Sequence, residues 1–444
     1  MRLKLTLAIA AIAAATLAPA QPPKQAFKAD IRLSASNYLA YPGPSPRKAL
    51  TPAPDSLRPF YISHYGRHGS RFLIGSEEYD EPLRILERAD SLGKLTTLGR
   101  DALRRIRWMK AEADGRLGEL TEVGFRQHRG IARRMYERFP EVFAEGAHVD
   151  ARSTVVIRCI LSMEEELQEL LRLNPALSVS HDASRHDMVY MNHANAAPSQ
   201  SAWTPAARKA WQELYDSEVD TVKLMHRLFN DMGYAREHVP MRRLNDQLFR
   251  LASATQNSRA RYEVTLYDLF DDRDVYANWL AANASWYIGY GCCPLGGGRQ
   301  PLSQATLLRR IIAEADSCIR LPHPSASLRF GHETVVLPLV CLMNLNGYGL
   351  ATDDLRRLDR KGWADYRVFP MAANVQMVFY RKDEDDREPL VKLLLNEDEA
   401  TLPIKAASGP YYRWADVKRY LLGRIDELQG AGKEQQKPGA GKAK

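Results

Sequence analysis

The pattern of apolar and polar residues predicts strands near both ends of the chain. The run over 60–65 is apolar, aromatic and β-branched, which is typical of a buried strand, and Gly66 and Gly69 predict a loop directly after it. Four further stretches have the character of strands: 148–152, 327–330, 374–380 and 390–395.

Apolar residues at helical spacing predict helices between and after these strands. Ser153 is expected to cap a helix that carries Met163 and Leu167 on one face, and Ser303 to cap one that carries Leu307. Another helix is expected after 331–334, with Pro338 near its first turn. The region 176–290 has a mainly helical pattern, and its tryptophans are expected to pack in the core: Trp203, Trp211, Trp279 and Trp286.

This order of elements predicts an α/β fold in which a sheet is interrupted by a helical insertion. The chain shows no internal repeat. The predicted parts are a signal peptide over 1–20, a Pro-rich extended lead-in over 21–59, the first part of the α/β core over 60–175, a helical cap over 176–290, the second part of the core over 291–429 and a disordered basic tail over 430–444.

The first residues have the features of a secretory signal. Arg2 and Lys4 precede an apolar stretch that ends at the small-x-small pattern Ala18-Pro19-Ala20, although a buried N-terminal helix is the alternative. The pattern predicts an exported protein, periplasmic or extracellular after cleavage. No other segment approaches the roughly 20 apolar residues of a spanning helix, so no integral membrane segment is expected.

The charge of the chain is concentrated at its ends. The 62 basic and 54 acidic residues give a net charge of +8, which is a reason to consider nucleic-acid binding. Five of these charges lie on Arg2, Lys4 and the lysine-rich last residues, and the body shows no basic stripe, so a nucleic-acid partner is not expected. With 45% hydrophobic and 26% charged residues, the composition is that of a globular protein and excludes a disordered or collagen-like chain.

The five cysteines indicate neither a metal site nor a redox motif. Export permits disulfides, but an odd number leaves at least one thiol unpaired in a monomer. No Cys-x-x-Cys pair occurs, so a zinc site and a thioredoxin-type site are not predicted. Most of the cysteines are expected to be buried as small apolar side chains.

The most informative segment follows the first predicted strand and reads Arg67-His68-Gly69-Ser70-Arg71. Ligands of open α/β sheets bind beyond the carboxyl ends of strands, and the glycines permit a close approach of a ligand. Two guanidinium groups around one imidazole suit a tetrahedral dianion, because arginine matches phosphate oxygens with its planar fork. Nearby positive charge also lowers the pKa of an imidazole and keeps a lone pair available for attack on phosphorus.

Two other interpretations of this histidine are open from the residues alone. His68 is equally typical of a satisfied loop or core residue. His64 and His68 are four residues apart and would suit a metal site on a helix, but the glycines and the apolar run argue against a helix here.

Four segments in order resemble the histidine phosphatase superfamily, in its acid-phosphatase and phytase branch. YGRHGSR at 65–71 resembles the RHGxR signature, and LTEVGFRQ at 120–127 resembles the LTxxGxxQ helix. ARSTVVIR at 151–158 resembles the RSTxxxR segment, and RFGHET at 329–334 resembles the segment of the second histidine and proton donor. The chain is most similar to bacterial, exported multiple inositol polyphosphate phosphatases. The resemblance implies a phosphoglycerate-mutase-like three-layer α/β domain with an inserted helical cap, and no cofactor.

The resemblance also implies the roles of five residues. His68 would be the nucleophile and form a covalent phosphohistidine. The groups that hold the transferring phosphoryl group would be Arg67, Arg71, Arg158 and His332. Without the motif, Arg158 is typical of a surface arginine on a helix, but a position in the first turns also suits anion binding.

The proton donor is expected to be Glu333, because the leaving alkoxide needs a placed general acid. Inositol polyphosphate phosphatases usually read His-Ala-Glu and ordinary phytases His-Asp, whereas this chain reads His332-Glu333-Thr334. Thr334 has no suitable pKa for an acid, although it suits a helix cap. Arg185, next to His186 at the start of the predicted cap, is a candidate contact to a remote phosphate, and a solvated loop is the alternative.

The sequence therefore predicts an exported phosphomonoesterase that acts on a small polyanion such as phytate, an inositol polyphosphate. A broad-specificity acid phosphatase or sugar-phosphate phosphatase is the alternative. A more remote alternative is a non-catalytic phosphate-ligand binder on the same fold.

Overall fold

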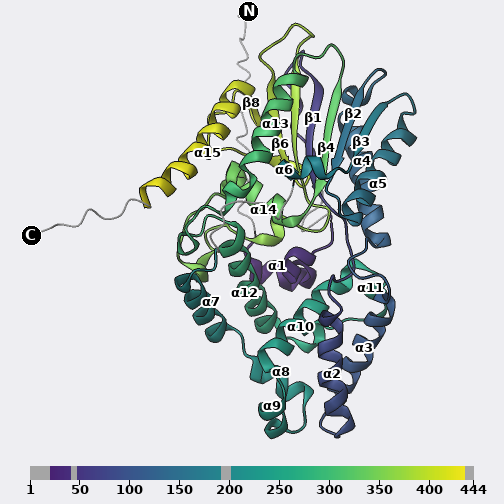
Figure 1. The fold of residues 1–444 in the computed structure, drawn as a ribbon, viewed down its shortest axis with the longest axis vertical. Helices are drawn as coiled ribbons and strands as arrows, with labels where there is room; N and C mark the ends of the chain where they lie inside the picture. The colour runs from purple at the N-terminus through teal and green to yellow at the C-terminus, as the bar shows by residue number, and fades with distance from the viewer. Residues whose placement is uncertain (1–20, 42–47, 192–201, 436–444) are drawn as a thin grey trace, which may run out of the picture.

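The computed structural model describes residues 21–41, 48–191 and 202–435. The chain forms a layered α/β domain and a lobe of helices below it in the view of Figure 1. The predicted signal peptide lies outside the described residues.

One mixed sheet forms the middle of the α/β domain. Its strands are β1 (Arg58–Arg67), β2 (His148–Ser153), β3 (Ser178–Asp182), β4 (Ser325–Gly331), β5 (Asn374–Arg381), β6 (Leu390–Leu395), β7 (Asp398–Ala400) and β8 (Tyr411–Arg413). The strand order is β3-β2-β4-β1-β5-β6-β7, with β8 paired to β6. β1 to β4 run parallel, whereas β5 runs antiparallel to β1. The carboxyl ends of β1, β2 and β4 therefore meet at one edge.

Helices cover both faces of this sheet, because successive side chains of a strand point to opposite sides. Ile62 of β1 packs with α4 (Glu122–Arg138) and α5 (Ile157–Leu173) on one face. Tyr61 packs on the other face, which is covered by α13 (Ala305–Cys318), α14 (Glu333–Met343) and α15 (Trp414–Gln435). The expected three-layer arrangement is confirmed (Figure 1).

The helical lobe is built from two parts of the chain. Its helices are α2 (Glu77–Ser91), α3 (Thr97–Ala113), α7 (Pro205–Glu218), α8 (Thr221–Leu228), α9 (Met232–His238), α10 (Met241–Ala254), α11 (Ala260–Glu263) and α12 (Asp272–Tyr290). α2 packs on α10, and α3 packs on α8. The lobe therefore takes in two helices of the segment predicted as the first part of the core, besides the predicted helical cap.

Three details of the cap region and its flanks differ from the sequence prediction. The edge strand β3 lies inside the region predicted as helical. The sequence did not predict this strand, because its residues SVSHD are polar and show no strand pattern. Ser153 does not cap α5, since it ends β2 and its hydroxyl donates to the carbonyl of Thr154. Ser303 does not cap α13 either, because it lies in a 3₁₀ turn that leads into the helix. Short α6 (Met188–Met191) precedes the undescribed residues 192–201.

The predicted extended lead-in is folded in its first part. Helix α1 (Pro23–Ala29) and a stretch of 3₁₀ turns over Ile31–Tyr38 lie between the sheet and the helical lobe (Figure 1). Phe27 and Leu33 are buried, because their apolar side chains contribute to the main core. The sequence prediction of an extended segment was wrong for these residues.

Two further differences concern the helices of the second half. Pro338 lies in the second turn of α14 rather than the first. α15 continues to Gln435, into the predicted disordered tail. The remaining residues 436–444 lie outside the described part.

All five cysteines lie within the described residues and are free thiols. Four are buried and Cys318 is half-buried, which confirms the expected packing role for most of them. No helix in the described part of the chain has the length and apolar character needed to cross a membrane.

Candidate active site

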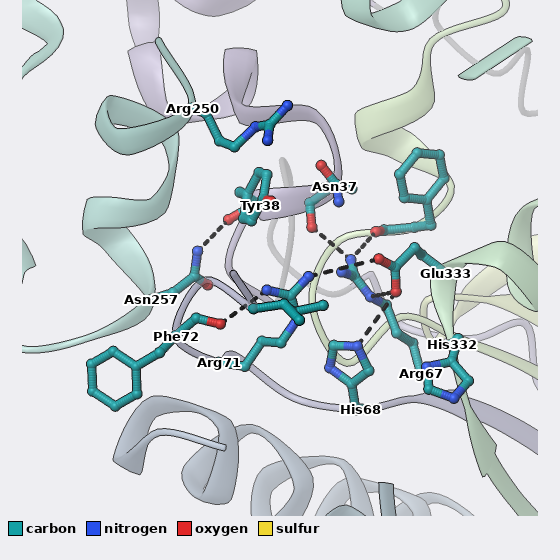
Figure 2. Close-up of polar contacts among 12 residues, drawn as sticks. Asn37, Tyr38, Arg67, His68, Arg71, Phe72, Arg250, Asn257, His332 and Glu333 are labelled. Carbon is teal, nitrogen blue, oxygen red and sulfur yellow. Dashed lines mark hydrogen bonds and ion pairs between the residues drawn. The ribbon is translucent and has the colours of Figure 1, made fainter. Parts of the chain in front are cut away.

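The predicted site residues meet where three parallel strands end. Arg67 is the last residue of β1 and His68 follows it, whereas His332 and Glu333 follow β4. Arg158 lies in the first turn of α5, which comes after β2. Figure 2 shows Arg67, His68, His332 and Glu333 close together.

His68 is fully buried, and its ring is oriented by the adjacent backbone. Nδ1 lies 2.9 Å from the carbonyl oxygen of Gly69. A carbonyl only accepts, so Nδ1 carries the hydrogen and Nε2 carries the lone pair. Burial lowers the pKa of His68 well below its ordinary value, and the charges of Arg67 and Arg158 lower it further against the opposing effect of Glu333. The imidazole is therefore neutral, with Nε2 available as a nucleophile.

Arg67 is a fixed cation beside this imidazole. Its Nη1 donates to the carbonyls of Asn37 (2.6 Å) and Phe369 (2.8 Å), and its Nε donates to Glu333 (3.1 Å). Burial lowers the pKa of Arg67 to about 10, which leaves the guanidinium protonated at neutral pH. Arg71 lies on the other side of the site, where its Nη1 donates to the carbonyl of Phe72.

Glu333 is the centre of the ion pairs in the site. Its carboxylate lies 3.1 Å from Nε of Arg67, 3.4 Å from Nε2 of His68 and 3.9 Å from Nη2 of Arg71 (Figure 2). Burial alone would raise the pKa of Glu333, but the positive charges of Arg67 and Arg71 outweigh it and hold this pKa well below its ordinary value. Its position in the first turn of α14 also suits a negative charge.

The ring of His332 lies next to that of His68 (Figure 2). The two rings are 5.8 Å apart at their centres and nearly perpendicular. Nε2 of His332 lies 3.2 Å from the hydroxyl of Thr154 and 3.7 Å from the thiol of Cys159. Thr154 belongs to the predicted RSTxxxR segment, so this segment positions a histidine besides contributing Arg158.

The helix after Leu120, whose role its sequence does not reveal, holds the loop of His68. The amide of Ser70 donates to Oε1 of Gln127 (2.8 Å). The amide and hydroxyl of Thr121 both donate to the carbonyl of Ser70. Gly69 and Gly124 are in contact, because a Cβ on Gly69 would lie 2.7 Å from Cα of Gly124. The spacing of the LTxxGxxQ motif reflects these contacts.

The charges of the site favour an anion over a metal ion. His68, His332 and Glu333 each place a ligand atom within 4.8 Å of the others, which among the described residues is a possible arrangement for a metal. However, the buried cations of Arg67 and Arg71 lie against the same carboxylate. Several buried nitrogen atoms also lack a hydrogen bond within the described residues: Nη2 of Arg67, Nε2 of His68, Nε of Arg71 and Nε of Arg158. A tetrahedral dianion matches such a set of groups.

A cleft of about 550 Å³ adjoins Arg71 and Glu333. One wall is the N-terminal segment from Ser34 to Tyr38, and the others come from α7, α10 and α12. Trp211 and Trp286 line it and are only half-buried, whereas Trp279 is buried in the core as predicted. Trp203, Trp211 and Trp286 are partly buried and pack against the core, as predicted, and Trp211 and Trp286 also line the cleft.

Two residues singled out in the sequence lie away from this site. Arg185 is exposed on a short 3₁₀ turn and is not among the described residues that line the cleft. His64 lies in β1, fully buried, with Nε2 4.0 Å from Glu166, so it does not form a pair with His68. Because His64 is part of a strand, the helical spacing of a metal pair does not apply.

A family model described as histidine phosphatase superfamily (branch 2) matches residues 66–396 of the chain. The chain belongs to this superfamily. Membership confirms the predicted family and the prediction of a phosphatase. No curated protein matches the chain in sequence.

Solved structures of similar fold include inositol phosphate phosphatases. A Bifidobacterium longum multiple inositol polyphosphate phosphatase, in complex with inositol hexasulfate, gives a TM-score of 0.74 at 18% identity over 87% of this chain and 97% of that chain. Its phosphate complex gives 0.75 at 17% identity with the same coverage. The phytase from D. castellii gives 0.65 at 14% identity over 90% of this chain and 87% of that chain. At these identities, the likeness confirms the fold.

Proposed function

We propose that the protein is a phosphomonoesterase that works through a phosphohistidine at His68. The observation that carries this proposal is the oriented, neutral imidazole between buried arginines, with a carboxyl group 3.4 Å from its Nε2. Phosphoryl transfer depends mainly on positioning and on charge stabilisation, and both are built into this arrangement.

In the first step, Nε2 of His68 attacks phosphorus while the bond to the ester oxygen breaks. Arg67, Arg71, Arg158 and His332 hold the oxygens of the phosphoryl group, and the leaving oxygen takes a proton from Glu333. The Nδ1 hydrogen of His68 stays on its hydrogen bond to Gly69, which spreads the positive charge that develops on the ring.

Substrate binding itself prepares Glu333 as the acid. In the structure, the carboxylate of Glu333 pairs with Arg67 and Arg71. A phosphoryl group that binds in the site competes with this carboxylate for both guanidinium groups. The negative charge of the substrate then raises the pKa of Glu333, which favours its protonated form. In the second step, water attacks the phosphohistidine, the N–P bond breaks, and Glu333 takes back a proton.

The proposed substrates are inositol phosphates, including polyphosphates such as phytate. The support is the order of the four motifs and the fold shared with structures named as inositol polyphosphate phosphatase and phytase. A sugar-phosphate phosphatase is the second candidate, because the cleft beside the site has aromatic walls and few cations. Export is proposed on the signal-like residues 1–20.

The mechanism is tested by His68→Ala. Release of phosphate from an inositol phosphate should disappear in this variant, and His226→Ala, an exposed histidine on α8, is the matched control. Quenching the wild-type reaction in alkali with labelled substrate should trap label on His68, since phosphohistidine resists base. Turnover that persists in His68→Ala would contradict the mechanism.

A further inference from the structure

The cleft beside His68 contains little net charge. Four charged side chains line it, two cationic and two anionic: Arg71, Arg250, Asp246 and Glu333. Nη1 of Arg250 already lies 2.9 Å from Glu78, and Arg71 faces Glu333. No lysine is among the described residues of the lining. Beyond the reacting phosphoryl group, the cleft therefore provides no excess of positive charge.

A densely phosphorylated ring is a poor fit for such a lining. Each phosphate carries between one and two negative charges near neutral pH, and its oxygens pair best with guanidinium groups. Phosphates that enter the cleft without such partners would lose hydration and gain no compensating ion pair. Asp246 would add repulsion.

The walls of the cleft offer flat apolar surfaces. Trp286 packs against Phe369 with ring centres 4.9 Å apart, which fixes its orientation. Trp211 donates from Nε1 to the carbonyl of Ala281 (2.9 Å), so its polar atom is satisfied. Aromatic faces of this kind contact the C–H face of a rigid ring.

Asp246 supplies an acceptor for hydroxyl groups next to these walls. Tyr215 and Asn245 both donate to Oδ1 of Asp246, and Oδ2 carries no hydrogen bond within the described residues. A carboxylate only accepts when it is ionised, so its natural partner is a hydroxyl donor and not a phosphate. A site that bonds a hydroxyl discriminates strongly against a ligand that lacks it.

We propose that the cleft binds the leaving group as a neutral, hydroxyl-bearing ring, stacked on Trp211 and Trp286 and hydrogen-bonded to Asp246. The preferred substrates are sugar or inositol esters with one phosphate, or few, rather than the hexakisphosphate. This proposal rests on the phosphatase function proposed above and ranks its substrates, with phytate below esters that carry one phosphate or few.

The wild-type enzyme tests the proposal with four alkyl phosphate esters. These are glucose 1-phosphate, myo-inositol 1-phosphate, ethyl phosphate and inositol hexakisphosphate, of which ethyl phosphate lacks a ring. Both ring monophosphates should exceed ethyl phosphate and the hexakisphosphate in kcat/KM, by about tenfold or more. A highest kcat/KM on the hexakisphosphate, or equal values on all four, would overturn the proposal and leave the phosphatase intact. Absence of phosphate release from all four would overturn the phosphatase as well.

Substitutions in the cleft should shift the preference in opposite directions. Asp246→Asn should lower kcat/KM for the ring monophosphates and raise it for the hexakisphosphate, because it removes a negative charge. Trp211→Ala should raise KM for the ring monophosphates by about tenfold. The controls are Asp272→Asn and Tyr262→Ala, two exposed positions outside the cleft lining, which should not change the preference.

A shift in preference is a readout that a loss of folding does not produce, because misfolding lowers activity on every substrate alike. If Asp246→Asn lowers kcat/KM equally for the ring monophosphates and the hexakisphosphate, the assigned role of Asp246 is wrong.

Discussion

In the proposed mechanism, Glu333 and a phosphoryl group compete for the same two arginines. The carboxylate of Glu333 is held by Arg67 and Arg71 and lies next to His68, so one side chain balances the charge of the site and is placed to supply the proposed proton. The longer side chain of glutamate, directly after His332, reaches this point from the first turn of α14. This contact places a carboxyl group at the reacting atoms despite the departure from the His-Ala-Glu pattern.

Replacement of Glu333 by Gln should affect poor leaving groups most. Without the acid, kcat for an alkyl phosphate should fall by about 10²–10⁴-fold, whereas an activated aryl phosphate should lose far less, since its leaving group needs no proton. Steady-state rates on the two esters measure the difference, and Glu122→Gln on the exposed first turn of α4 is the control. Equal losses on both esters would exclude Glu333 as the proton donor.

The sequence identified the charged groups of the site more readily than the residues that hold them. Arg67, His68 and Glu333 stand in short motifs with chemically distinctive side chains. Asn37 contributes only a backbone carbonyl to Arg67, and any residue type provides one. The hydroxyl of Ser162 accepts a hydrogen bond from the amide of Gly69 and donates one to the carbonyl of Arg158. Neither leaves a local pattern that sequence reasoning can detect.

At the scale of the element, α4 acts as a support for the catalytic loop. Its first turn approaches the loop so closely that side chains do not fit between them at Gly69 and Gly124. Gln127 and Thr121 then fix the backbone of Ser70 from the same helix end. The position of His68 therefore depends on the position of α4.

Gly124→Ala should misplace the loop without unfolding the protein. A Cβ at this position would lie 2.5 Å from the carbonyl oxygen of Ser70, which is backbone and does not yield easily. A displacement of this kind should lower kcat/KM by about 10–100-fold. Gly130→Ala on the same helix is a matched control, because its Cβ would meet only the flexible side chain of Arg134. Similar rates for both variants would show that the close contact is not needed.

Elements with a strong apolar pattern were the predictable ones. β1 and β5 were expected from runs of buried residues, and both occur close to the predicted ranges. β3 was not predicted, because it is a polar edge strand that is defined by its pairing with β2. The N-terminal 3₁₀ turns were not predicted either. Their folded conformation depends on contacts with both lobes, which the local sequence does not encode.

At the scale of the whole molecule, a buried carboxyl group joins three parts of the chain. Asp365 accepts hydrogen bonds from Ser36 of the N-terminal segment and from Trp279 of α12. The amide of Asp365 donates to Asn283 of the same helix (2.8 Å). Burial raises the pKa of Asp365 to about 6. The junction between the two lobes therefore contains a group that is costly to ionise.

Asp365→Asn should stabilise the protein at neutral pH. A pKa raised on folding means that this group's contribution to stability is present at low pH and is lost as the pH rises from about 4 to about 6. The amide retains the acceptor for Trp279 and adds a donor for Ser36. The free energy of unfolding should therefore rise by about 1–3 kcal/mol at pH 7.5, with a smaller gain near pH 4.

Denaturant unfolding at the two pH values checks this prediction, and Asp353→Asn, at an exposed position, is the control. The same gain at both pH values would contradict a buried, titrating carboxyl group at position 365.

The strand pairing also determines when the site can form. β1 carries Arg67 but pairs with β4 and β5, which lie more than 250 residues later in the chain. Closing loops of this length before any pairing is gained makes such a topology slow to fold. A nascent chain that ends before β4 lacks His332 and Glu333, so it does not hold the complete set of groups around His68. Recovery of activity after denaturation should therefore require the pairing of β1 with β4.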